Sequence, residues 1–386
     1  MKKKCKPLHY YIDYEEFIAM DLRTLNHFLA DLESRLDEAE ELRVEQEWLD
    51  FADLKRNSGA FRTSRVPKAS AIDWPKMLVN DALEDVTDMI YQQLWSVNQT
   101  LEAGGGEMHC IRSNYGTCII PSMFDVQIHI MPRSTDTLPG NKPFADGSAG
   151  IRRMLSQGKA WDFTKNFAGK TFEMAEQYLA LAKAYPNVSR FIHYYNPDLQ
   201  GPLALCETLW GSSFYEDFYD EDAMESHLLE DALDYFTELY LDFTDRFHRL
   251  APTFDPEHSV EWGCLHRGGT IIRNDSAMNI SGDLYQEFVM PRDQKIISAV
   301  GGGIHFCGKG DHYIQHVAAI EGLTCINMSE PARNNMEKIY SNTVDRDIII
   351  FGLLKSEVDR AIASGRELHG RVHAGASTAA WLGKRD

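Results

Sequence analysis

The chain lacks the segments that mark membrane or exported proteins. No run of about 18 apolar residues occurs in its 386 residues, so no transmembrane helix is expected. The basic start, Met1 to Lys6, is not followed by the apolar stretch of a signal peptide. Its 7 cysteines are irregularly spaced and do not form the pattern of a disulfide framework. We therefore expect reduced thiols and a cytoplasmic protein.

Positive charge is also scarce. The chain has 39 Lys and Arg against 58 Asp and Glu, which gives a formal net charge of -19. Such a chain repels nucleic-acid phosphates and anionic membrane surfaces, so neither is an expected partner. The nucleotide-binding signatures are missing too, because no G-x-G-x-x-G follows the first predicted strand and no Walker-type phosphate loop occurs. A small-molecule substrate remains the expected ligand.

No Pro/Ser-rich linker or internal repeat divides the chain, but the residue pattern changes near position 105. Residues 12–56 and 81–101 have the three-to-four spacing of amphipathic helices, so 1–105 is predicted to be a helical extension. From 106 to 386, strand-like and helical segments alternate. The predicted strands are Met108–Ile120, Val126–Met131, Val188–Tyr195, Ile271–Ser276, Ile304–Cys307, Leu323–Met328 and Asp347–Leu353.

This alternation is typical of parallel βαβ units, which build either an open Rossmann-type sheet or a closed barrel. Because the nucleotide-binding signatures are missing, the barrel is favoured. The predicted fold class is therefore α/β, a (β/α)8 TIM barrel over 106–386 preceded by the helical extension.

The segment 303–308, which reads Gly-Ile-His-Phe-Cys-Gly, carries the sharpest chemical signal. Side chains at i and i+2 of a strand point to the same face, so His305 and Cys307 are expected to project together. They lie where the strand ends, which is the catalytic side of a parallel barrel. Imidazole nitrogen and thiolate sulfur are both good zinc ligands.

Glu330 follows Cys307 by 23 positions, about one strand-helix repeat, at the end of the next predicted strand. His305, Cys307 and Glu330 together would leave one position of a tetrahedral zinc open, as in catalytic sites. The alternative is a buried histidine beside a buried free cysteine, which needs no metal.

Further polar residues lie at predicted strand ends. Asp275 is a candidate for proton transfer or substrate binding, and Ser276 follows it; capping the next helix is the alternative. The pairs His312/His316 and Cys264/His266 also have metal-ligand spacing, but an exposed face and chance spacing explain them better. Candidate substrate-binding residues are Arg112, Tyr115, Asn196, Asp198 and Arg273, for which packing and turn roles are the alternatives.

Three blocks in this order resemble the uroporphyrinogen decarboxylase superfamily. They are Arg273–Ser276 continuing to Leu284–Phe288 and Pro291, then the segment 303–308, then Asn327–Pro331. The resemblance covers roughly 108–365 and implies a TIM barrel. It implies further that His305, Cys307 and Glu330 match three zinc ligands of the branch that transfers methyl groups between a corrinoid and a thiol.

The function that the resemblance implies is a zinc-dependent methyltransferase whose corrinoid is carried by a partner protein. That branch has a further Cys ligand near its C-terminus, but no Cys follows Cys325 here. His369, His373, Cys264, Cys325 or water would have to replace it. Two alternatives stay open: a tetrapyrrole decarboxylase with a basic pocket of Arg112, Arg133 and Arg273, and a non-catalytic corrinoid or tetrapyrrole carrier.

Overall fold

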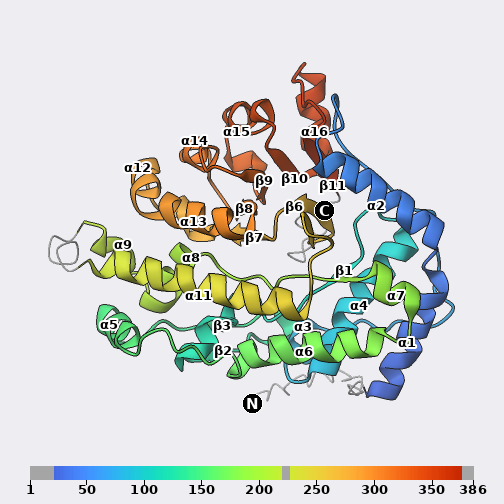
Figure 1. The fold of residues 1–386 in the computed structure, drawn as a ribbon, viewed down its shortest axis with the longest axis horizontal. Coiled ribbons are helices and arrows are strands. Elements are labelled where there is room, and N and C mark those ends of the chain that lie inside the picture. Colours follow the sequence, from blue (N-terminus) through green and yellow to red (C-terminus); the bar gives the residue numbers. More distant parts are fainter. Residues whose placement is uncertain (1–20, 220–226, 376–386) are drawn as a thin grey trace, which may run out of the picture.

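The computed structural model describes residues 21–219 and 227–375 (Figure 1). Its largest sheet has five parallel strands in the order β11-β10-β9-β8-β7. These are β7 (Thr270–Arg273), β8 (Gly302–Phe306), β9 (Leu323–Met328), β10 (Ile349–Leu354) and β11 (Val372–Gly375). The helices between them are α12 (Gly282–Leu284), α13 (Met290–Val300), α14 (Ile314–Val317), α15 (Met336–Asn342) and α16 (Lys355–Ala363). The prediction of an α/β protein with parallel strands is confirmed.

Shorter strands surround this sheet. They are the parallel pair β1 (Cys110–Ile111) and β4 (His193–Tyr194), and the antiparallel pairs β2 (Ile128–His129) with β3 (Gly140–Asn141) and β5 (His258–Glu261) with β6 (Cys264–Arg267). Single parallel bridges extend the main sheet on both sides, from Gln200 to Arg273 and from Phe61 to His373. Among the described residues the pairing stops there, so a closed eight-stranded barrel is not shown.

The other helices precede β5 in the chain. They are α1 (Leu22–Arg35), α2 (Glu38–Ala52), α3 (Val79–Ala82), α4 (Val86–Ala103), α5 (Ser148–Ser156), α6 (Asn166–Ala182), α7 (Pro186–Phe191), α8 (Pro202–Trp210), α9 (Phe214–Asp217) and α11 (Leu228–Leu250). Local signals set several of their ends. The Asp37 carboxylate accepts the Glu40 N–H at the start of α2, and Gly104 takes a left-handed φ of 68° where α4 ends.

Some element predictions were wrong. The first half of the predicted strand Val188–Tyr195 is the end of α7, and only the two-residue β4 follows it, because Pro186 occupies the first turn of a short helix. The predicted strand Met108–Ile120 contains only β1 before the chain turns into 3-10 helix. The hairpin of β5 and β6 was not predicted, nor was β11. The first residues of the predicted helix 12–56 lie outside the described residues.

The two faces of the main sheet pack against different partners. Ile272, Ile304, Ile326 and Ile350 join the large core formed with the surrounding helices. The alternate residues Ile271, Cys325 and Phe351 instead form a second cluster with α2. Trp48 of α2 is fully buried there, and its indole N–H donates to the Gly106 carbonyl at 2.8 Å.

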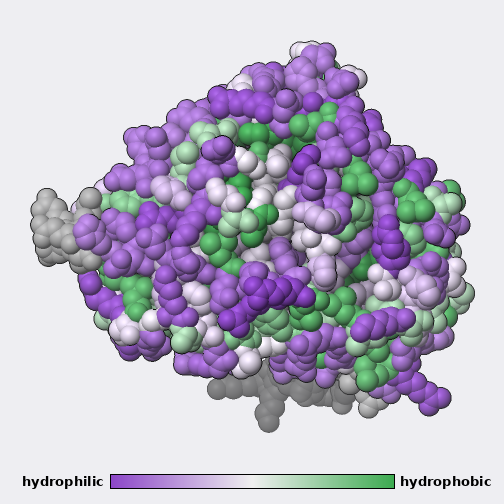
Figure 2. All heavy atoms as spheres, in the orientation of Figure 1, coloured by the Kyte–Doolittle hydropathy of each residue, from purple (hydrophilic) through white to green (hydrophobic). Residues whose placement is uncertain are grey.

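Residues from the predicted extension thus complete one face of the sheet, and Figure 1 shows α2 beside β11. The domain boundary at residue 105 stays a prediction. None of the described helices combines the length and the apolar character needed to cross a membrane. The face in Figure 2 is mostly hydrophilic, with paler and hydrophobic residues near its middle, where Figure 1 places β7 and β8.

A buried carboxyl group joins α13 to the end of β7. Asp293 is fully buried, and its Oδ2 accepts hydrogen bonds from the Tyr285 hydroxyl at 2.6 Å and the Asn274 amide at 2.6 Å. Burial raises the pKa of Asp293 to about 7, although both hydrogen bonds oppose this.

We predict that Asp293→Asn flattens the pH dependence of stability. The raised pKa means that the folded state holds a proton that the unfolded chain releases near pH 4. The resulting stabilisation is complete below pH 4 and is lost as the pH rises through about 7. Its size is a few kcal/mol at most. In thermal unfolding from pH 4.5 to 8, the Tm of the wild type should fall with rising pH by more than the Tm of the variant. A difference in Tm that stays constant over this range would contradict the prediction.

Candidate metal centre

Four neighbouring strands, β7 to β10, each contribute one residue to a row across the sheet that includes His305. Arg273 of β7 lies opposite His305 of β8, His305 lies opposite Asn327 of β9, and Asn327 lies opposite Phe351 of β10. Residues paired in this way project from the same face of a parallel sheet. The row lies toward the C-terminal ends of the strands, where the chain leaves the sheet and further side chains can gather.

Two glycines let β8 fit between its neighbours. Gly302 has a φ of 123°, a backbone conformation that residues other than glycine rarely adopt. A Cβ on Gly303 would lie 2.5 Å from the Cys325 carbonyl oxygen and would also collide with the Cys325 sulfur. This close approach of β9 brings Asn327 beside His305, so the glycines preceding His305 contribute to the geometry of the site.

Asp275, His305 and Cys307 form a group that could hold a metal ion, because one ligand atom from each lies within 4.8 Å of the other two. The His305 Nε2 atom is 3.4 Å from the Cys307 sulfur and 3.3 Å from Asp275 Oδ1. The same Asp275 oxygen accepts the backbone N–H of Cys307 at 3.1 Å. Nitrogen, sulfur and carboxylate oxygen are the three kinds of atom that zinc binds in proteins.

The charges of this group stabilise one another. Burial alone would lower the pKa of His305, but its contacts with Asp275 and Cys307 raise it to about 10. Burial likewise favours a high pKa for Asp275, but the neighbouring His305 and further hydrogen bonds lower it to about 2. The surroundings of Nε2 therefore favour a positive charge, and a metal ion that binds this atom has to displace its proton.

Residues of β9 and the following loop support the two central side chains. The His305 Nδ1 atom lies 2.6 Å from Asn327 Oδ1, on the ring edge opposite Nε2. The Asn327 side-chain nitrogen donates to the Phe351 carbonyl at 3.1 Å. The Ser329 hydroxyl lies 3.3 Å from the Cys307 sulfur. Such outer contacts commonly orient metal ligands.

A buried network of paired charges adjoins the group. The Asp198 carboxylate contacts Arg112 at 2.7 Å and Arg273 at 2.8 Å, and Arg273 also pairs with the fully buried Glu261 at 2.6 Å. Burial favours a raised pKa for Asp198, but the two guanidinium groups lower it below its usual value. Burial raises the pKa of Glu261 to about 7 despite Arg273. Both arginines are therefore already matched by carboxylates.

Trp262 occupies the turn of the β5–β6 hairpin with a left-handed φ of 50°, which is rare for a large side chain. Its ring lies against the Arg273 guanidinium, 4.2 Å from the ring centre, and 5.3 Å from the His305 ring. Strained residues of this kind concentrate at functional sites. The hairpin thus places an aromatic ring against both the charge network and the metal-ligand group.

The fold resembles that of a known methyltransferase. The solved structure of a methyltransferase from Methanosarcina mazei aligns with 86% of this chain and 93% of its own, at a TM-score of 0.56 and 14% sequence identity. No protein-family model matches the chain, and no curated protein matches it. At this identity the likeness concerns the fold alone.

The structure places Glu330 outside the group of three. Its carboxylate pairs with Arg333 at 3.3 Å and is partly exposed. It is still close, because a Cβ on Gly308, next to Cys307, would lie 3.5 Å from Glu330 Oε2. Asp275, expected to act on a substrate, is the carboxylate of the candidate group, and Glu330 as a ligand stays a prediction.

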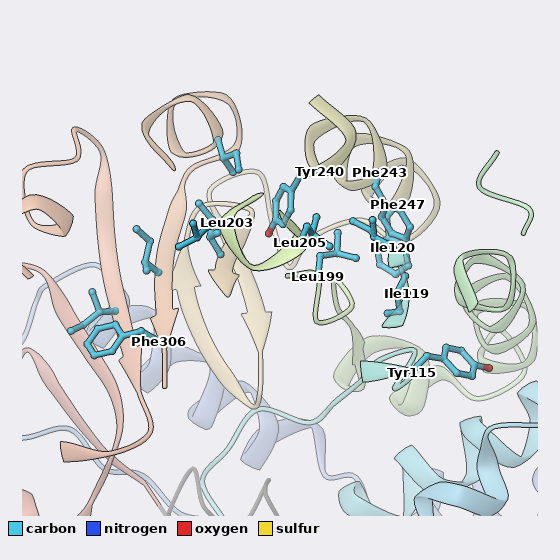
Figure 3. Close-up of a cluster of buried hydrophobic side chains, with 14 of the residues drawn as sticks. Tyr115, Ile119, Ile120, Leu199, Leu203, Leu205, Tyr240, Phe243, Phe247 and Phe306 are labelled. Carbon is cyan, nitrogen blue, oxygen red and sulfur yellow. The ribbon is translucent and has the colours of Figure 1, made fainter. Parts of the chain in front are cut away.

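The other candidate residues have structural partners. Ser276 donates to Glu207, and Asn196 donates to Thr270 at 3.1 Å. Tyr115 is fully buried, stacks on Phe167, and lies across the core from Phe306 in Figure 3. Their predicted roles stay untested.

The two other pairs with metal-ligand spacing, Cys264/His266 and His312/His316, do not belong to the group. Cys264 lies 3.9 Å from His373, and His312 contacts the Ile280 carbonyl at 2.9 Å. His369 faces Asp345. The six cysteines that the structure describes are free thiols.

Four residues around the group were not predicted from the sequence to belong to the site: Asn327, Ser329, Trp262 and Glu261. Asn327 and Ser329 had a usable signal, because both follow the two-residue spacing of β9 toward its end, as His305 and Cys307 do on β8. Trp262 and Glu261 had none, since the hairpin that carries them was not predicted.

We predict that Gly303→Ala destabilises the protein by about 1–3 kcal/mol, because the new methyl group has no space against Cys325. Gly140→Ala is the matched control, since a Cβ there meets no atom within 4 Å. Urea unfolding of the two variants measures the difference. Equal stability would show that β8 and β9 do not need this close approach.

Proposed function

We propose that the chain is a zinc-dependent methyltransferase whose metal is held by His305, Cys307 and a carboxylate. The observation that carries the proposal is the convergence of His305, Cys307 and Asp275 at the strand ends, with ligand atoms within 4.8 Å of one another. The likeness of the fold to a methyltransferase supports it. A methyl-accepting thiol and a corrinoid on a partner protein complete the proposal, and both come from the family resemblance.

The proposed architecture is a (β/α)8 barrel. Two observations support it: the five-stranded sheet gains a further parallel bridge on each side, and β1 and β4 form another parallel pair. The His305 group would then lie on the C-terminal face of the barrel, where such enzymes have their active sites.

A bound zinc ion would lower the pKa of a substrate thiol and so favour the nucleophilic thiolate. The chain's own residues position the reactants. His305 and Cys307 supply the nitrogen and sulfur ligands, and Asp275 holds both through its Oδ1 atom. Trp262 and the ion pairs of Arg273 would cover the metal-ligand group on the side of β7 and limit the access of water there.

A second candidate function is a metal-free decarboxylase, favoured by the adjacent buried guanidinium groups of Arg112 and Arg273. Both groups already pair with Asp198, however, and Arg133 pairs with Asp81 on an exposed surface. A polycarboxylate would have to compete with these internal carboxylates. A third candidate function is the carriage of a tetrapyrrole or corrinoid without turnover. Measurements of metal content and turnover distinguish such a carrier from the two enzymes.

The first test is metal content. We expect about one zinc per chain in purified protein, because three ligand types converge, and none in a His305→Ala, Cys307→Ala double variant. Cys264→Ala, which removes a thiol outside the group, should keep its zinc. Elemental analysis measures the zinc per chain, and circular dichroism checks that each variant is folded. Folded wild-type protein that takes up no zinc would rule out the metal centre.

A second test identifies the carboxylate ligand. We expect Asp275→Asn to weaken zinc binding by roughly 10- to 100-fold, because a neutral amide replaces the carboxylate beside His305 and Cys307. Glu330→Gln should change it little. Chelator competition gives both affinities. The reverse result would assign the third ligand to Glu330.

Activity is then assayed with zinc-loaded protein, methylcobalamin and a panel of small thiols. Methylated thiol that forms in proportion to the enzyme, and not with the double variant, would support methyl transfer. Zinc binding without any methyl transfer would leave a metal protein of another activity.

A further inference from the structure

We infer that Asn327 is a positioning residue that keeps a proton on Nδ1 of His305 and so reserves Nε2 for the metal. The inference deepens the proposed function and rests on it for the identity of the ligand. It concerns a residue outside the group of three, whose side chain contacts His305 and the Phe351 carbonyl.

The orientation of the Asn327 amide is set by the neighbouring strand. Its nitrogen donates to the Phe351 carbonyl at 3.1 Å, so its oxygen must face the other way, toward His305. Asn327 lies opposite both residues in the strand register and is 3% exposed. Turning the amide over would bring its oxygen against the Phe351 carbonyl, and a buried hydrogen bond would be lost.

An amide oxygen only accepts hydrogen bonds, so the 2.6 Å contact with His305 requires a proton on Nδ1. This holds for the neutral ring and for the charged ring alike. The proton released when a metal binds must therefore come from Nε2. That atom already faces Cys307 at 3.4 Å and Asp275 at 3.3 Å.

The variants separate this role from plain packing. Asn327→Leu keeps a similar volume but removes the acceptor, and we expect zinc binding to weaken by about 10- to 100-fold. Asn327→Asp restores an acceptor oxygen and should bind zinc more tightly than the leucine variant. Thr324→Val, which removes a hydroxyl at the other end of β9, should bind zinc as wild type does.

A spectroscopic readout tests the tautomer directly. In the full chain with 15N-labelled histidine and bound cadmium-113, we expect the metal to couple to Nε2 of His305 while Nδ1 carries a slowly exchanging proton. Asn327→Leu should lose that slow exchange. Coordination through Nδ1 in wild type, or a leucine variant with unchanged affinity and exchange, would overturn the inference.

The experiment also separates failure of the proposed metal site from failure of the Asn327 inference. If wild type binds no metal, the proposed function fails, yet the Nδ1 proton can still be followed in metal-free protein. Slow exchange in wild type that disappears in Asn327→Leu would then support the Asn327 contact alone. Equal exchange in both proteins would refute it.

Discussion

The parallel register of β7 to β10 is the constraint on which the site depends. Arg273, His305, Asn327 and Phe351 lie in one row across the sheet, so each side chain meets its neighbour at a fixed spacing. A slip of one residue would turn His305 toward the apolar core on the other face. The close approach at Gly303 holds this register, because the strands can come together there only without a side chain.

The row divides the site into two electrostatic parts. On the β7 side, Arg273 belongs to a network in which arginines and carboxylates neutralise one another. On the β8 side, His305 is surrounded by Asp275, Cys307 and the Asn327 oxygen, which all favour positive charge at this place. The Trp262 ring contacts both parts, because it lies against the Arg273 guanidinium and 5.3 Å from the His305 ring.

Support for the site comes from segments far away in the sequence. Trp48 and Phe51 of α2 fill one face of the sheet together with Phe351, whose carbonyl holds Asn327. The β5–β6 hairpin brings Glu261 and Trp262 to Arg273. Helix α2 thus packs on the strand whose carbonyl holds Asn327, although it lies far from the site in the sequence.

The sequence by itself determined the strand-helix alternation from β8 to α16 and the shared face of His305 and Cys307, because a two-residue period and a glycine-flanked strand end are local properties. It also picked out Asp275 and Glu330 as strand-end carboxylates, but it assigned Glu330 to the metal and did not predict that Asp275 meets the histidine. Only the tertiary structure decided that, since the answer depends on how loops from separate strands turn at the edge of the sheet. The roles of Asn327 and Trp262 were likewise decided by the register and by an inserted hairpin, which no spacing along the chain encodes.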